Sequence, residues 1–141
     1  MTATFSLLEH KLAIEELIGR YNHSLDSYDL TTWLDCWTDD AVFDGIGKYL
    51  VGKAAIKSFA DTYERDFGAH MPSGKHYTVN ILSQINGDQA TSRSYLQLVR
   101  TTAKGVQIVF TGRYEDTLRR EGETWRFAGR KMIQDFPPKT V

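Results

Sequence analysis

The sequence predicts an α+β fold in which three N-terminal helices pack against a strongly curved, mainly antiparallel sheet. Apolar residues recur every three or four positions up to about residue 67, and they alternate with polar residues after about residue 75. Helices followed by a meander of strands favour helices gathered on one face of a sheet. Strands of ten or more residues must twist and bend, so the sheet should curve around the helices and leave an interior pocket.

The first helix is predicted from about Leu7 to Leu25 or Tyr28, because this segment carries one apolar stripe at helical spacing. The stripe consists of Ile14, Leu17, Ile18, Tyr21, Leu25 and Tyr28. Asp29 suits an N-cap, so a short second helix is expected from Leu30 to Trp37. Gly52 precedes the third predicted helix, Lys53 to Phe67.

The remaining segments read as strands and turns. AVFDGIG is expected to be a strand broken by its glycines, with KYLV as its short partner, and GAHMPSGK is expected to be a loop. Tight hairpins suit NGD at 86–88 and REGE at 120–123. The four long strands are predicted at His76–Ile85, Gln89–Arg100, Val106–Leu118 and Thr124–Phe136.

Composition excludes several classes of protein. The chain has 141 residues, 41% apolar and 25% charged, which suits one ordinary globular domain spanning 1–141. A net charge of −1 without a basic run argues against nucleic acid as a partner, and no apolar stretch is long enough for a membrane helix. The single Cys36 excludes an internal disulfide and a cysteine-built metal site. Because the N-terminus does not resemble a signal peptide, we expect a cytoplasmic protein.

Three segments carry a family resemblance: WTDDAVF, GKHYTVN and GRYEDTLRREGETWRFAGR. With the order of elements, they resemble the SnoaL-like branch of the nuclear transport factor 2-like superfamily, from about Leu8 to Phe136. The resemblance implies a cone-shaped α+β barrel. It does not define a reaction, since the superfamily includes dehydratases, isomerases, cyclases, hydrolases and members without chemistry.

Within the superfamily, the pattern is most similar to scytalone dehydratase, bile acid 7α-dehydratase and hexachlorocyclohexane dehydrochlorinase. The Asp–His dyad of these families falls on Asp26 in LDSYDL and His76 in KHYTVN. Tyr21 matches a tyrosine of the bile acid enzyme five positions before its Asp, and Arg130 in AGRKM fits an arginine of the last strand. The resemblance therefore implies His76 and Asp26 as the dyad and Tyr21 and Arg130 as donors.

These four side chains suffice for the elimination of water. A neutral histidine is the natural base near neutral pH, and a carboxylate on one ring nitrogen fixes its tautomer. The other nitrogen takes a proton next to a carbonyl or a leaving group, while Arg130 or Tyr21 donates to the oxygen that gains charge. We therefore expect no metal and no organic cofactor.

The chain also departs from these families. The second catalytic histidine of scytalone dehydratase falls near Arg100, and its serine and asparagine fall on Gly112 and Tyr114. A lysine of the dehydrochlorinase is replaced by Tyr21. We therefore expect the chain to share none of those exact substrates.

A structural alternative stays open for each residue. Asp26 suits a solvated helix end, His76 a strand residue with a satisfied bond, and Arg130 a surface or ion-pair role. Tyr21 suits core packing, and it lies about 140° from Asp26 around an ideal helix, so the two converge only if the helix bends or ends between them.

Further residues are candidates for substrate binding. Trp33, Trp37 and Phe43 suit either the lining of the pocket or the core. By strict alternation Asn80 shares the face of His76, which makes it a candidate polar residue of the pocket.

The sequence therefore predicts a cofactor-independent lyase that acts on a small, largely apolar cyclic or polyketide- or steroid-like substrate. An isomerase or cyclase with the same base is the first alternative. The second alternative is a non-catalytic ligand-binding or assembly subunit. In outline the chain also resembles the small subunits of ring-hydroxylating dioxygenases, which implies such a role. Exposed apolar residues on an open sheet face predict a homo-oligomer, a dimer or a trimer.

Overall fold

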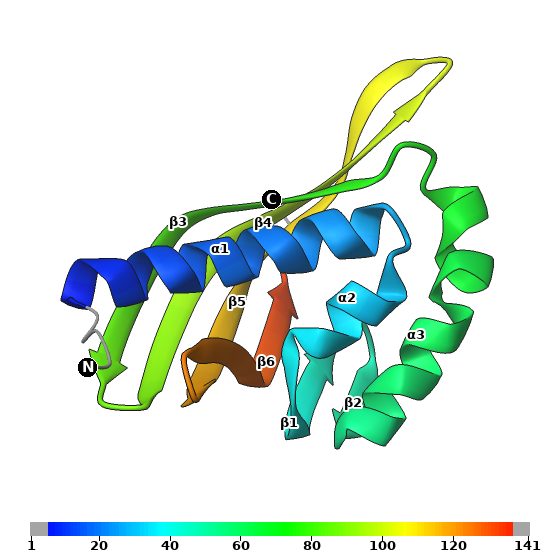
Figure 1. Cartoon of the computed structure of the whole chain (residues 1–141). Helices are drawn as coiled ribbons and strands as arrows, with labels where there is room; N and C mark the ends of the chain where they lie inside the picture. Colours follow the sequence, from blue (N-terminus) through cyan, green and yellow to red (C-terminus); the bar gives the residue numbers. More distant parts are fainter. Residues whose placement is uncertain (1–5, 137–141) are drawn as a thin grey trace.

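The protein is described by a computed structural model of residues 6–136 (Figure 1). Its elements are α1 (Leu7–Asp26), α2 (Leu30–Asp35), β1 (Trp37–Gly45), β2 (Lys48–Val51), α3 (Lys53–Phe67), the 3₁₀ helix η1 (Gly68–His70), β3 (Lys75–Asn86), β4 (Gln89–Thr102), β5 (Gly105–Glu121) and β6 (Thr124–Gln134). α1 lies lengthwise across one face of the sheet, and α2 and α3 lie near its C-terminal end. The predicted order of elements is confirmed.

The first helix begins with a capping box. The Ser6 hydroxyl accepts a hydrogen bond from the backbone N–H of Glu9, and the Glu9 carboxylate accepts one from the backbone N–H of Ser6. The predicted stripe is buried from Ile14 to Leu25. Within residues 6–136, no helix combines the length and apolar character that crossing a bilayer requires.

Some predicted boundaries change. Asp29 caps α2 as expected, with its side chain accepting from Thr32 N, but α2 ends at Asp35 because Trp37 already pairs with Phe127 in the sheet. The last strand ends at Gln134 instead of Phe136, and the loop after α3 begins with the turn η1.

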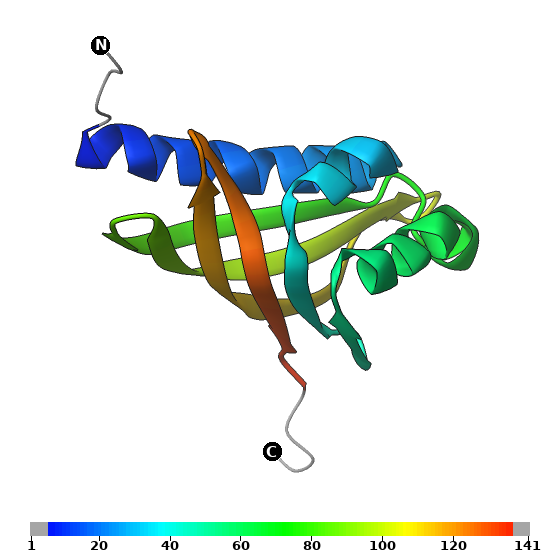
Figure 2. The same ribbon diagram turned by 60° about the horizontal axis from the view of Figure 1, so that its bottom comes forward.

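The sheet is open and strongly twisted (Figure 2). Its strand order is β2-β1-β6-β5-β4-β3, so β2 and β3 form its two edges within the described chain. Neighbouring strands are antiparallel except β1 and β6, which run parallel, with Trp37 beside Phe127 and Phe43 beside Arg130. The predicted α+β class, with helices inside a curved and mainly antiparallel sheet, is confirmed. The parallel pair is an addition that the sequence did not indicate.

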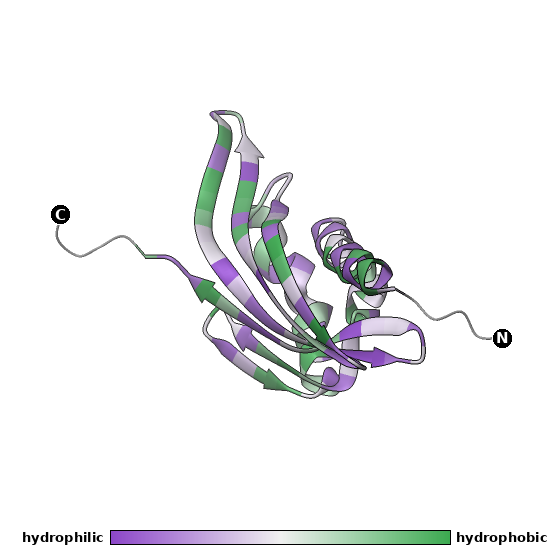
Figure 3. Cartoon of the chain, turned by 90° about the vertical axis from the view of Figure 1, so that its left-hand side faces the viewer, coloured by the Kyte–Doolittle hydropathy of each residue, from purple (hydrophilic) through white to green (hydrophobic). Residues whose placement is uncertain are grey.

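Alternation along the long strands separates an inner face from an outer one (Figure 3). In β3 this alternation is interrupted by a bulge between Val79 and Leu82, where Asn80 has a φ of 55°. Asn80 is exposed and lines a shallow hollow of the outer face together with Tyr95 and Arg113. The prediction that Asn80 shares the face of His76 is therefore wrong, because the bulge reverses the alternation before residue 80.

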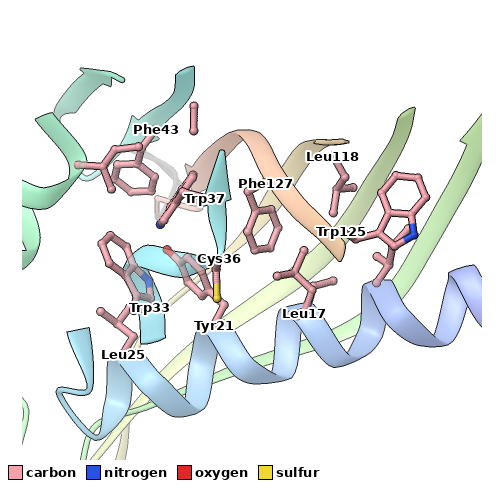
Figure 4. Close-up of a cluster of buried hydrophobic side chains, with 14 of the residues drawn as sticks. Leu17, Tyr21, Leu25, Trp33, Cys36, Trp37, Phe43, Leu118, Trp125 and Phe127 are labelled. Carbon is pink, nitrogen blue, oxygen red and sulfur yellow. The ribbon is translucent and has the colours of Figure 1, made fainter. Parts of the chain in front are cut away.

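The core is an aromatic cluster between α1, α2 and the β1–β6 pair (Figure 4). Tyr21 rises from α1 among Trp33, Trp37 and Phe127, with ring centroids 5.4–5.8 Å away. Phe43 stacks on Phe59 of α3 at 6.0 Å. These contacts between aromatic rings fill the interior where the helices meet the sheet.

Two glycines make a matched test of this packing. A Cβ on Gly112 of β5 would lie 2.5 Å from the carbonyl oxygen of Ile133 on β6, whereas a Cβ on Gly19 of α1 would meet nothing within 4 Å. We expect Gly112→Ala to lower the free energy of unfolding by about 1–3 kcal/mol, since two backbones must separate. Gly19→Ala should raise it by about 0.5–1 kcal/mol, because alanine loses less backbone entropy in a helix. Urea unfolding measures both; an unchanged midpoint for Gly112→Ala would contradict the close approach of β5 and β6.

Candidate active site

The carboxylate of Asp26 holds His76 by two hydrogen bonds. Asp26 is the last residue of α1, and His76 is the second residue of β3. Asp26 Oδ1 lies 2.6 Å from His76 Nδ1, and Oδ2 accepts from the backbone N–H of His76 at 3.0 Å. Both side chains are mostly buried, with 18% of Asp26 and 11% of His76 exposed. The predicted pair is therefore in contact, and its carboxylate fixes both the ring and the strand that carries it.

The ring nitrogen Nε2 remains available, because Nδ1 faces Asp26 and the ring has no further hydrogen bond within residues 6–136. The pair borders a hollow whose wall includes Tyr28, Tyr63, Phe67 and Met71. Its volume is about 10 Å³, about the space that one water molecule needs. The interior pocket expected from the sequence is therefore almost filled by side chains in this structure.

Tyr21 and Arg130 form a second buried pair. The Arg130 guanidinium lies 4.4 Å from the ring centroid of Tyr21 and 3.5 Å from that of Tyr114. Its Nε and Nη2 donate to the carboxylate of Asp116 at 2.9 and 3.2 Å, and both side chains of this ion pair are fully buried. Asp116 also accepts from the Ser92 hydroxyl. Of the two alternatives for Arg130, the structure shows a buried ion pair and not a surface position.

Burial and charge act in opposite directions on the pKa values of Asp116 and Arg130. Burial raises the pKa of Asp116, against the opposing effect of Arg130. Burial also disfavours the charge of Arg130, but Asp116 and the phenols of Tyr114 and Tyr21 outweigh it, so the pKa of Arg130 is raised. The pKa values of Tyr21 and Tyr114 are raised by burial as well. Arg130 therefore stays charged and both phenols stay neutral at neutral pH.

The two pairs do not touch each other. α1 continues without a break from Tyr21 to Asp26, so the two side chains leave it in different directions, as the helical spacing indicated. Tyr63 of α3 lies near both Tyr21 and Asp26: burial raises the pKa of its phenol, and these two residues add to the effect. The first pair reaches the hollow, and the second lies deeper in the aromatic core.

Four buried donors have no acceptor at hydrogen-bond distance and angle among the described protein atoms: Trp33 Nε1, Trp37 Nε1, Arg130 Nη1 and the Ser94 hydroxyl. Trp33 and Arg130 still approach the Tyr21 hydroxyl closely enough to lower its pKa, although burial has the larger, opposite effect. Buried donors without partners are rare in folded proteins, so this region suits an added oxygen acceptor. Trp33, Trp37 and Phe43 belong to the core and do not line the hollow beside His76.

Sequence reasoning missed three residues of this region. Tyr28 borders the hollow from the turn after α1, where its φ is 59°, and Tyr63 of α3 also lines it, but neither was predicted to belong to the site. Asp116 had no predicted role, although it occupies an inward-facing position of β5 between Tyr114 and Leu118. An acid in such a row is almost never buried without a partner, and this pattern could have indicated a buried ion pair.

No group of three or more His, Cys, Asp or Glu side chains within residues 6–136 is placed to hold a metal ion. Cys36 is buried, and burial raises the pKa of its thiol to about 11. A thiol in this environment is not a nucleophile at neutral pH.

Comparison with known proteins identifies the family to which this chain belongs. The sequence pattern of the SnoaL-like domain matches residues 6–131, and the chain belongs to this family, whose members are often enzymes that act on small molecules. No curated protein matches the chain.

Several solved structures share the fold. Rv3472 of Mycobacterium tuberculosis, a protein of unknown function solved as its D26N variant, is 30% identical with a TM-score of 0.81, over 93% of this chain and 79% of that chain. A proposed aromatic ring hydroxylase from Novosphingobium aromaticivorans is 32% identical with a TM-score of 0.77, over 94% of both chains. A proposed scytalone dehydratase from the same species is 20% identical with a TM-score of 0.78, over 92% of this chain and 86% of that chain, and shows the fold alone.

The buried ion pair makes a prediction about stability. Asp116→Asn leaves the Arg130 charge buried without a counter-charge, so we expect the free energy of unfolding to fall by about 3–5 kcal/mol. The neighbouring Glu115→Gln is the control: Glu115 is about half exposed beside Arg113, and its loss should cost less than about 1 kcal/mol. Urea unfolding of both variants compares them; equal losses would contradict the buried pair.

Proposed function

We propose that the protein is a cofactor-independent lyase that removes water from a small, largely apolar cyclic substrate of polyketide or steroid type. The observation that carries the proposal is the 2.6 Å contact between Asp26 Oδ1 and His76 Nδ1 beside an aromatic-lined hollow. Membership of the SnoaL-like family adds support for small-molecule chemistry.

In the proposed reaction, His76 Nε2 takes the proton from the carbon next to the substrate carbonyl. Asp26 keeps the proton on Nδ1 and stabilises the imidazolium that forms. The electron pair of the broken C–H bond forms a C=C bond as the neighbouring C–O bond breaks. The hydroxide leaves as water after receiving a proton, for which the imidazolium is the nearest source. A general base of this kind contributes roughly 10²–10⁴-fold to rate.

Tyr21 and Arg130 are assigned to the substrate oxygen within the same proposal. Arg130 Nη1 and the indole N–H groups of Trp33 and Trp37 are buried donors that lack acceptors, which is the environment a carbonyl gaining negative charge requires. For a substrate to reach both pairs, side chains that line the hollow, Tyr63, Phe67 and Met71 among them, must move aside, since the hollow holds only about 10 Å³.

Two alternatives use the same architecture. An isomerase or cyclase would form the same enolate and return the proton elsewhere, giving a product of unchanged mass. A non-catalytic ligand-binding or assembly subunit is favoured by one observation, the nearly filled interior. The likeness to a proposed aromatic ring hydroxylase also suits this second alternative.

The test is a panel of small cyclic β-hydroxy ketones incubated with the protein in deuterated water and followed by mass spectrometry. We expect loss of one water molecule, and a decrease of at least 100-fold in rate for His76→Ala. His23→Ala is the control, because His23 is exposed on α1 and should leave the rate unchanged. Equal rates for His76→Ala and the native protein would exclude the base role. A product that loses no water and differs in mass from the substrate only by incorporated deuterium selects the isomerase, and binding without any conversion or exchange selects the non-catalytic subunit.

A homo-oligomer, a dimer or a trimer, belongs to the same proposal. The outer face of β3 and β4 exposes Tyr77, Val79, Leu82 and Tyr95, with 47–62% of each side chain accessible. Contiguous apolar surface of this kind marks an interface.

We therefore expect sedimentation velocity to show a dimer or trimer that Tyr95→Glu shifts towards monomer, because a charge would be buried at the contact. Val106→Glu, at the exposed tip of the β4–β5 hairpin, serves as the comparison and should leave the assembly intact. A native protein that sediments as a monomer at all concentrations would refute the interface.

A further inference from the structure

A second cavity lies at the opposite end of α1 from the His76 site. It is a groove of about 800 Å³ between the first turns of α1 and the ends of strands β3 to β6. Leu7 lines it and Asp26 ends the same helix 19 residues later, which corresponds to about 28 Å along the axis. Figure 3 views the molecule from this end, and the residues that line the groove and those that line the hollow beside His76 do not overlap. The groove is therefore separate from the His76 site.

The floor of the groove is an apolar row across three strands. Ile85 of β3 pairs with Ala90 of β4, and Ala90 pairs with Leu118 of β5. The small Ala90 between two branched side chains leaves the hollow open, and Leu7 of α1 stands at its edge with 60% of its side chain exposed. A volume of several hundred Å³ with an apolar floor is typical of small-molecule sites.

The charges around the groove have one sign. Among residues 6–136, Lys11 and Arg119 are its charged residues, and no Asp or Glu lines it. The guanidinium of Arg119 is already paired with Asp40. Lys11 is half-buried, and its ammonium donates only to the carbonyl and hydroxyl oxygens of Ser83, at 2.7 and 3.4 Å. A half-buried ammonium without a carboxylate partner favours an incoming anion.

We propose that this groove binds an amphipathic organic anion, with its apolar body on the row Ile85–Ala90–Leu118 and its carboxylate on Lys11. The ligand class follows from the combination of an apolar floor, one unneutralised cation and the absence of any acid in the lining. The site is distinct from the proposed lyase site and does not depend on that proposal.

The experiment measures binding of decanoate to the full chain by calorimetry, below the concentration at which decanoate forms micelles. The uncharged 1-decanol is the matched ligand. We expect decanoate to bind at least fivefold more tightly than decanol, because only decanoate can pair with Lys11. Lys11→Met, which keeps an apolar stem, should weaken decanoate binding at least fivefold and leave decanol binding unchanged. Lys57→Met removes an exposed lysine that is paired with Asp61 on α3, and it should bind as the native protein does.

Two further variants place the ligand. Ala90→Leu fills the floor and should abolish binding of both ligands, whereas His76→Ala should change neither. Equal affinity of the native protein for decanoate and decanol, or unchanged decanoate affinity in Lys11→Met, would overturn the proposal even if Ala90→Leu does not fold. Loss of decanoate binding in His76→Ala would also overturn it, by placing the ligand at the other site. Displacement of a second copy of the chain by decanoate, seen in parallel sedimentation, would make that copy the natural occupant and overturn it as well.

Discussion

The carboxylate of Asp26 joins the end of the first helix to the start of the sheet, and the geometry of the candidate site depends on that junction. One oxygen meets the ring of His76 and the other meets its backbone N–H, so the acid orients the side chain and anchors the strand at the same point. A histidine held only through its ring could still turn with a mobile strand. Here the base and its support are one unit, which is the kind of preorganisation that acid–base chemistry needs.

A second constraint lies deeper, where a full positive charge is buried inside an aromatic core. Arg130 is kept there by Asp116 and by the faces of Tyr114, Tyr21 and Phe127. Buried ion pairs contribute little net stability compared with apolar residues of the same volume. Besides Arg130 Nη1, the indole N–H groups of Trp33 and Trp37 are buried in this core without a hydrogen-bond acceptor among the described protein atoms. The polar groups of this core are therefore consistent with a ligand that carries oxygen.

Much of the fold and the central pair could be predicted from the sequence, because the signals were local or carried by a motif. The apolar stripe from Ile14 to Leu25 defined α1, and LDSYDL with KHYTVN indicated the contact between Asp26 and His76. Asn80 was misplaced because a one-residue bulge reverses a face without leaving a mark in the pattern of hydrophobicity.

Other features depend on contacts that only the folded chain brings together. Tyr63 lies near Tyr21 and Asp26 because α3 packs there, and Asp116 of β5 pairs with Arg130 of the neighbouring strand β6. The near closure of the hollow follows from the summed volumes of rings contributed by several elements, which periodicity does not encode.

The parallel contact between β1 and β6 sets the order in which the chain can complete its fold. β1 has β2 on one side, a short partner close in sequence, whereas its other side finds its partner only in residues 127–131 of β6, far along the chain. Until β6 pairs, this second side of β1 has no strand beside it, and Trp37 lacks its neighbour Phe127. Pairing of such distant segments is slow, since a long loop must close first. A fragment that stops before β6 would leave this side of β1 and the ring of Trp37 uncovered, and unpaired strand edges of this kind make folding intermediates prone to aggregation.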